Sequence, residues 1–283
     1  MEQANALNHL GSVAVRQRRY QDGVSYFEQA LDCGHGTGDQ ASQCYSHANL
    51  AFVLFLQGRG QEAIEHLEQA LALYRATGNT RGEAATAAYL GFVDLRQGRY
   101  EQAAAHLRRS FGLYSDAGDR GGEAFALGNL GEVELRQGHD EEAARHLRQS
   151  LALWREFGER SNQADILAAL GLIDLRQGRY PQATGHLEQA LDLCRETGNQ
   201  STEATVLNGL GEVLLATGRS ADARARQAGA LELASQAGEK YEQARAHAGL
   251  GTCSQASGPR TRASGTGGEP TPCTPAWVPR KLT

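Results

Sequence analysis

The sequence has few aromatic residues, a single methionine and no long apolar run. Aromatic residues make up only 6% of its 283 residues, and the formal net charge is -5. A chain with this charge has no general attraction to nucleic acid. The lack of a long apolar run argues against a membrane-spanning helix or a signal peptide. We therefore expect a cytoplasmic protein that binds neither nucleic acid directly nor a membrane.

The sequence also lacks the motifs that carry catalysis or bind cofactors. It contains no G-x-S-x-G, Walker loop, H-E-x-x-H or G-x-G-x-x-G pattern. Its cysteines form no C-x-x-C pair and show no metal spacing, which is typical of reduced thiols inside a cell. They are Cys33, Cys44, Cys194, Cys253 and Cys273. We predict a protein that is not an enzyme and needs no cofactor.

What the sequence does contain is a 40-residue repeat that runs through six copies without insertion or deletion. One column of this repeat is always leucine, and others hold small residues. The leucine column is Leu10, Leu50, Leu90, Leu130, Leu170, Leu210 and Leu250. One glycine column is Gly58, Gly98, Gly138, Gly178 and Gly218. Such a period predicts an architecture in which each repeat is one supersecondary element.

Each repeat has the pattern of two helices. In the third repeat, apolar residues recur at helical spacing over residues 82–97 and again over residues 101–117. Gly118 ends the second helix, because glycine takes the positive φ of a helix C-terminus. Asp119 offers a cap to the next helix. We therefore predict an all-α fold of thirteen helices, six pairs and one unpaired helix, through Gly251.

The small residues explain how these helices pack. Gly91 on a first helix and Ala103 on the following second helix let two backbones approach closely. A single pair cannot bury its apolar face, so the repeats must stack into a superhelix with first helices on its concave side. The predicted solenoid covers residues 1–251, in repeats 1–40, 41–80, 81–120, 121–160, 161–200 and 201–240 and a half repeat 241–251.

The spacing of Leu90-Gly91, Ala103, Leu107 and Ser110 resembles the tetratricopeptide (TPR) pattern L-G…A…F…A. The resemblance recurs in every repeat. The period of 40 residues resembles a long-repeat subclass, and the usual closing proline is absent. The resemblance implies an α-α superhelix, a TPR solenoid, that holds a protein or peptide partner in its concave groove.

Two stretches narrow the resemblance further. LRQGRYEQAAAHLRRS and GEKYEQARAHAGLG resemble the C-terminal repeat regions of actinobacterial SARP-type transcriptional activators and related nucleotide-binding regulators. In that family the repeats sense signals and contact proteins, whereas DNA binding and nucleotide hydrolysis lie upstream. The resemblance implies the partner-binding module of a bacterial regulator. A free-standing adaptor with no link to transcription is the alternative.

The family resemblance places four columns of the first helices along the groove, those of Tyr45, Asn49, Phe52 and Leu56. Aromatic side chains there have no packing role and indicate a contact surface. Asparagine amides can both donate to and accept from a peptide backbone. The predicted partner-binding residues are Tyr45, Asn49, Phe52, Tyr89, Phe92, Arg96, Phe125, Asn129, Arg136 and Arg176.

The arginines in this set recur one repeat apart. Such a rail of cations would bind carboxylates. The alternative is a solvated face paired with the acidic residues two positions earlier, although that offset does not put two side chains on one helical face. These acidic residues are Asp94, Glu134 and Asp174.

Four histidines share one column of the second helices. Adjacent second helices lie roughly 10 Å apart, too far for two of these side chains to share a zinc ion with bonds of roughly 2 Å. We interpret them as a surface column inherited by duplication. They are His66, His106, His146 and His186.

The repeat pattern stops after Gly251. Residues 252–283 are rich in Gly, Pro, Thr and Ser, which predicts a disordered tail. Because the register stops so abruptly, we also predict a frameshift. Read one base earlier, the codons of Trp277 and Val278 force a glycine at position 278, in the column of Gly78.

Overall fold

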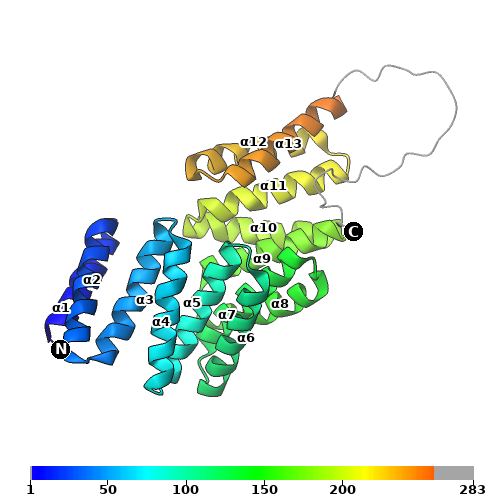
Figure 1. Ribbon diagram of the computed structural model, residues 1–283. Helices are drawn as coiled ribbons and strands as arrows, with labels where there is room; N and C mark the ends of the chain where they lie inside the picture. Colours follow the sequence, from blue (N-terminus) through cyan, green and yellow to red (C-terminus); the bar gives the residue numbers. More distant parts are fainter. Residues whose placement is uncertain (1, 258–283) are drawn as a thin grey trace, which may run out of the picture. The chain divides into compact units, whose positions relative to one another are not determined.

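The computed structural model describes residues 2–257, and this part of the chain consists of helices and short turns without a strand (Figure 1). It contains thirteen helices, as the sequence predicts. They are α1 (Glu2–Arg16), α2 (Tyr20–Thr37), α3 (Gln40–Leu56), α4 (Gly60–Ala76), α5 (Thr80–Arg96), α6 (Tyr100–Ala117), α7 (Arg120–Gln137), α8 (Asp140–Phe157), α9 (Arg160–Arg176), α10 (Tyr180–Thr197), α11 (Gln200–Ala216), α12 (Ser220–Ala237) and α13 (Lys240–Ser257). Among these helices, none is apolar over a length sufficient to cross a membrane.

The helices form antiparallel pairs of an odd-numbered first helix and an even-numbered second helix. The turn within a pair is short, as at residues 97–99 between α5 and α6. From α1 to α8, and again from α10 to α13, each helix packs on the next one along the chain. First helices also touch each other, as α1 touches α3 and α5 touches α7. This sequential stacking confirms the predicted all-α solenoid of helix pairs.

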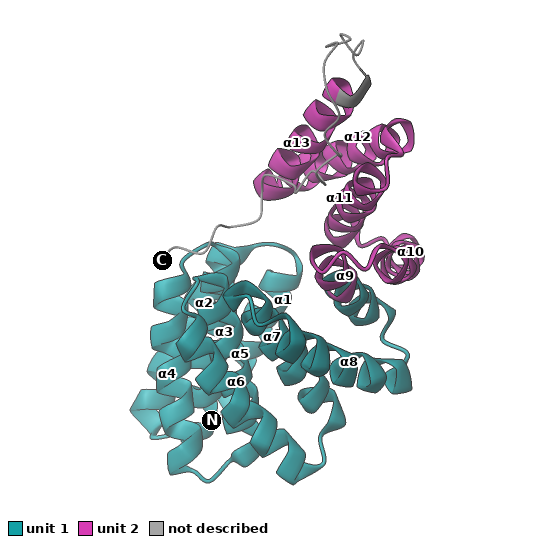
Figure 2. Cartoon of the chain, turned by 90° about the vertical axis from the view of Figure 1, so that its right-hand side faces the viewer, with its two compact units in different colours: residues 1–169 teal, residues 170–283 magenta. Residues whose placement is uncertain are grey.

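The chain divides into two compact units, unit 1 (residues 1–169) and unit 2 (residues 170–283) (Figure 2). The boundary falls inside α9, which is one continuous helix. The sequence predicts a single array over residues 1–251. The division lies within a helix rather than in a linker, and the single array stays a prediction.

Helix α13 continues past Gly251 to Ser257. The predicted end of the repeats is therefore too early. Nothing in residues 252–257 breaks a helix, and the next residue in the sequence, Gly258, stands in the column of helix-ending glycines. The rest of the predicted disordered or frameshifted tail lies outside the described residues.

Local chemistry sets where the helices begin and end. The Asp119 side chain accepts a hydrogen bond from the Gly122 N–H at 3.0 Å, which confirms the predicted cap. Gly118 has a φ of +66°, the left-handed conformation predicted for it. The same cap occurs at Asp39, Asn79 and Asn199.

A glycine on the first helix lets the two helices of a pair come into contact. A Cβ atom on Gly91 would lie 2.5 Å from Leu107 Cγ and 3.1 Å from the carbonyl oxygen of Ala103. Gly131 and Gly171 meet the equivalent leucines in the same way. The close approach predicted for Gly91 and Ala103 is thus confirmed, and a leucine side chain fills the space.

One residue departs from the glycine pattern in the described part of the chain. Arg18 occupies the column of Gly58 and has a φ of +60°, which costs a non-glycine residue roughly 1 kcal/mol. We expect Arg18→Gly to raise the free energy of unfolding by about 1 kcal/mol in urea denaturation. The matched control is Gly58→Arg, at a φ of +76°, which should lower it by a similar amount. A loss of stability in Arg18→Gly would contradict the assignment of strain.

Candidate functional site: an aromatic surface on the first helices

Helix α3 has an apolar solvent face. Its 17 residues include no Asp, Glu, Lys or Arg. The exposed fraction is 47% for Tyr45, 43% for Phe52 and 43% for Leu56. A surface helix normally pairs its apolar stripe with a polar or charged face, so large apolar side chains on the outside indicate a contact surface.

Aromatic residues of α5 and α7 extend this face. Tyr89 is 46% exposed, and its ring centroid lies 6.3 Å from that of Phe125. Phe125 lies 6.4 Å from Phe92, and Phe92 meets Phe55 of α3 edge-on at 5.3 Å. The structure thus brings Tyr89, Phe92 and Phe125 together and links them to α3. Phe92 and Phe125 are half-buried, and Phe92 packs against the core, so the expectation that it has no packing role is wrong. We call the following residues the aromatic surface: Tyr45, Phe52, Leu56, Tyr89, Phe92 and Phe125.

The exposure of two further apolar residues has a different cause. Leu10 is 49% and Val13 44% exposed, whereas Leu50 and Val53 in the same columns are buried. Leu50 and Val53 pack in one cluster with Phe27 of the preceding pair. Within the described residues, no helix pair packs on Leu10 and Val13 as the pair of Phe27 packs on Leu50 and Val53, and we do not count them in the aromatic surface.

A small cavity lies between α1 and α3. Its volume is about 220 Å³, and its walls include Phe52 and Asn49, two of the predicted binding residues. Arg16 also lines it. The sequence analysis did not include Arg16 among the binding residues. It could have been found, since Arg16 stands two repeats before Arg96 in the column of the rail arginines.

The predicted asparagines are partly engaged within their own helices. Asn49 Nδ2 donates to the carbonyl oxygen of Tyr45 at 2.9 Å, and Asn129 Nδ2 donates to that of Phe125 at 2.9 Å. An amide has two N–H groups and one oxygen. Each asparagine therefore keeps its oxygen and one N–H for a partner, fewer groups than the sequence alone suggests.

The rail arginines are exposed but differ in their partners. Arg136 Nη2 lies 3.1 Å from Glu132 Oε1, one helical turn earlier. Arg96 has no hydrogen bond or ion pair within the residues that the structure describes. Arg176 lies in unit 2, so the rail within unit 1 consists of Arg16, Arg96 and Arg136.

The histidine column binds buried carboxylates of the first helices. His106 Nδ1 lies 2.9 Å from Asp94 Oδ2, and Arg99 Nε lies 2.9 Å from Asp94 Oδ1. The same contact recurs at 2.8 Å as His146–Glu134 and His186–Asp174. The interpretation as a surface column is therefore wrong, because each pair joins the two helices of one repeat. The alternative pairing of Asp94 and Glu134 with rail arginines is wrong for the same reason. The described part of the chain holds no group of three His, Cys, Asp or Glu residues suited to a metal.

In the second repeat, His66 meets another histidine instead of a carboxylate. The Nδ1 atoms of His47 and His66 lie 2.9 Å apart. Burial, followed by the positive charge of His66, lowers the pKa of His47 from 6.5 to about 4. Burial also lowers the pKa of His66. Both rings therefore stay neutral in the folded protein at a pH where the unfolded chain binds protons.

We expect this histidine pair to make folding sensitive to acid. Because the folded pKa of His47 lies below its unfolded value, its contribution is fully present above pH 6.5 and is lost as the pH falls toward about 4. Urea denaturation across this range measures the loss. In His47→Ala, which copies Ala87 of the next repeat, the pH dependence should be weaker. An identical pH profile in the variant would show that the pair does not titrate in this way.

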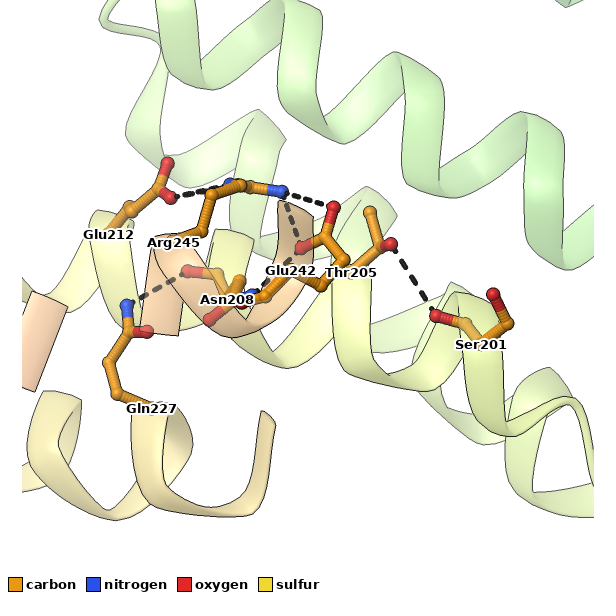
Figure 3. Close-up of polar contacts among 7 residues, drawn as sticks. All are labelled: Ser201, Thr205, Asn208, Glu212, Gln227, Glu242 and Arg245. Carbon is orange, nitrogen blue, oxygen red and sulfur yellow. Dashed lines mark hydrogen bonds and ion pairs between the residues drawn. The ribbon is translucent and has the colours of Figure 1, made fainter. Parts of the chain in front are cut away.

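Unit 2 contains a buried charge cluster (Figure 3). Arg245 of α13 lies 2.8 Å from Glu212 of α11 and 3.0 Å from Glu242. Asn208 Nδ2 donates to Glu242 Oε2 at 2.8 Å, and Gln227 Nε2 donates to the Asn208 carbonyl oxygen at 3.3 Å. Burial raises the pKa of the Glu212 carboxyl, even though Arg245 opposes this shift. The stacking of α13 on α11 thus includes one cation between two buried carboxylates.

Two members of this cluster stand in columns that hold mostly apolar residues in the other repeats. Glu212 stands in the column of Phe52 and Phe92, and Gln227 stands in the column of Leu67. Glu212 Oε2 and Gln227 Oε1 are buried without a hydrogen-bond partner in the described part of the chain. Both substitutions were visible in the sequence, but the contacts among three helices were not.

Comparison with known families confirms the first resemblance. Four overlapping matches to the family described as Tetratricopeptide repeat cover residues 2–76, 42–116, 83–156 and 122–196. A further match with the same description covers residues 168–238. The resemblance to SARP-type regulators stays a prediction. No curated protein is similar enough in sequence to match the chain.

Solved structures with this architecture share few residues with the chain. The Cut9–Hcn1 hetero-tetramer of APC/C has a TM-score of 0.70 at 18% identity, covering 89% of this chain and 43% of the solved one. A Rap protein complexed with competence and sporulation factor has a TM-score of 0.63 at 16% identity, covering 89% and 75%. A STAND protein with a tetratricopeptide repeat sensor from Pyrococcus horikoshii has a TM-score of 0.66 at 15% identity, covering 87% and 37%. These identities show the fold alone, so the absence of enzyme activity and the cytoplasmic location stay predictions.

Proposed function

Because this chain belongs to the tetratricopeptide repeat family, we propose that it is a scaffold that holds a segment of a partner protein on the aromatic surface. The observation that carries the proposal is α3, a helix without charged side chains that exposes Tyr45, Phe52 and Leu56. Aromatic side chains are common anchors of protein interfaces, because they bury a large area with few rotatable bonds.

The exposed areas suggest how tightly such a partner binds. Fully burying one large apolar side chain contributes roughly 1.5–3 kcal/mol. The three residues of α3 are less than half exposed, so together they supply roughly 3 kcal/mol. Tyr89 and the cavity beside Phe52 add to this. Since a dissociation constant of about 1 μM needs about 8 kcal/mol, we expect micromolar rather than nanomolar binding.

The rail within unit 1 adds a charge preference. The columns of Tyr45 and Leu56 lie eleven positions apart in α3, which is about 16 Å along a helix. Arg16 and Arg96 share the column of Leu56. The aromatic surface therefore has one basic edge, which favours an apolar segment with acidic residues on one side.

At a finer level, we propose that the scaffold serves as the sensor or partner-binding module of a bacterial regulator. The resemblance of residues 95–110 and 238–251 to repeat regions of SARP-type activators supports this proposal. The STAND protein with a repeat sensor provides a parallel in which such repeats serve a signalling protein. A free-standing adaptor is the alternative. An adjacent reading frame that encodes a winged-helix or nucleotide-binding domain would favour the regulator.

A peptide selection tests the scaffold function and defines the kind of segment that binds. A random peptide library is selected on the immobilised full chain, with counter-selection against Phe52→Glu, which places a charge in the centre of the α3 face. We expect selected peptides to be apolar with acidic flanks and to bind the wild-type chain alone. Peptides that bind both proteins equally, or no enrichment at all, would contradict the proposed surface.

A further inference from the structure

A larger cavity lies in unit 2, among the helices α10, α11 and α12. Its volume is about 680 Å³, within the range of pockets that bind small molecules. Leu210 and Leu214 of α11 and Tyr180 of α10 give it apolar walls, and Arg226 of α12 brings a cation. All these residues belong to one compact unit.

The third repeat shows how this space is filled elsewhere. Asp94 holds both Arg99 and His106. Arg99 Nη1 also donates to Gln61 of α4, the preceding second helix, at 3.1 Å. The resulting network ties successive second helices, α4 and α6, to the first helix between them.

In the sixth repeat this network is missing. Leu214 stands in the column of Asp94, and Arg226 stands in the column of His106. Without the carboxylate, Arg219, which precedes α12, donates to Asp222 in the first turn of that helix at 2.9 Å. No side chain in the described part of the chain then ties α12 to α10 as Arg99 ties α6 to α4, and the cavity occupies this place.

Because arginine replaces histidine in this column, the cavity has a cation, Arg226, in its lining. Its side chain is half-buried and has no hydrogen bond or ion pair within the described residues. Among the acidic residues at the cavity, Asp222 is engaged by Arg219, and Glu188 is exposed. A carboxylate stabilises a guanidinium that is partly withdrawn from water, because the two groups can form two parallel hydrogen bonds.

We propose that this cavity binds a small amphipathic carboxylate, with the carboxylate on Arg226 and an apolar body against Leu210 and Leu214. The site is separate from the function proposed for the aromatic surface, since it lies wholly within unit 2 and takes a small molecule. The lining is mixed, with Thr184, Glu188, Thr217, Arg219 and Asp222 beside the apolar residues. Its apolar part on α11 and the unpaired cation of Arg226 match one anionic group on an apolar chain. A multiply charged ligand would leave charges against leucine.

Decanoate is a suitable probe, and the sequence supplies the control variant. Leu214→Asp combined with Arg226→His copies Asp174 and His186 of the preceding repeat, so the variant should fold and rebuild the missing pair. Titration of the full chain with carboxyl-labelled decanoate, followed by NMR, should show saturable binding. We expect binding at least tenfold weaker in the double variant and in Arg226→Gln, and weaker binding of methyl decanoate than of decanoate.

Any of three results with decanoate would overturn the proposal. In the first, decanoate does not bind the wild-type chain saturably. In the second, decanoate binds the double variant as tightly as the wild-type chain. In the third, the wild-type chain binds methyl decanoate as tightly as decanoate. Acidic peptides that bind in an Arg226-dependent way while decanoate does not would also overturn it, in favour of a peptide site. Thermal melting of each variant confirms that a loss of binding is not a loss of fold.

Discussion

Replacing Arg245 with alanine is expected to destabilise unit 2 by about 3–5 kcal/mol, the usual cost of leaving a buried charge without its partner. Arg245 is the cation between Glu212 and Glu242. Its removal leaves two buried carboxylates without an opposing charge. Urea denaturation of the full chain measures the loss, and amide hydrogen exchange in α11 and α13 locates it.

Removing all the charges of the cluster at once gives a different expectation. Glu212→Leu, Gln227→Leu, Glu242→Thr and Arg245→Thr replace the cluster with residues found in the same columns of other repeats. Removing a buried ion pair as a whole is often neutral or stabilising by about 1–4 kcal/mol. We expect this quadruple variant to be more stable than Arg245→Ala, because it leaves no buried charge without a partner. If Arg245→Ala costs less than about 1 kcal/mol, the cluster is solvated and the account of it is wrong.

Phe52→Ala combined with Tyr89→Ala is expected to weaken the binding of a selected peptide by about 30-fold or more, which corresponds to about 2 kcal/mol. These two rings lie on neighbouring first helices and are both substantially exposed. Truncation should change affinity with little effect on folding. Isothermal titration calorimetry with the wild-type and variant chains measures the difference.

The arginines and the controls refine this test. Arg96→Ala should cost under about 1 kcal/mol, because an exposed ion pair is screened by water. Variants of the histidine column are unsuitable as controls, since they would strip buried carboxylates of their partners. Glu68→Ala and Gln69→Ala alter exposed positions of the second helix α4 instead. A similar loss of affinity in these controls would contradict a site on the first helices.

The repeat register and helix boundaries could be predicted because each depends on a local rule. Gly118 ends its helix through its own positive φ, and Asp119 caps the next helix by accepting a hydrogen bond from the first turn of that helix. The packing of Gly91 against Leu107 follows from a small residue that recurs at one place in each pair. One neighbouring turn or helix determines each of these features, so a single repeat is enough to infer them.

The polar contacts could not be predicted in the same way. His106 and Asp94 lie twelve positions apart on two helices, and their contact depends on how these helices pack. A signal existed, because an acidic residue accompanies the histidine in three consecutive repeats. The cluster around Arg245 occurs only once, so no recurrence could reveal it. The apolar face of α3 was predictable in part, since its residues lack charge altogether.

Photo-crosslinking most directly tests the claim that the aromatic surface holds the partner. A selected peptide carries a benzophenone in place of its central apolar residue, and mass spectrometry identifies the crosslinked residues of the full chain. We expect crosslinks on α3 and α5, near Tyr45, Phe52 and Tyr89, that excess unlabelled peptide prevents. Competed crosslinks confined to the second helices α4 and α6 would contradict the proposed site.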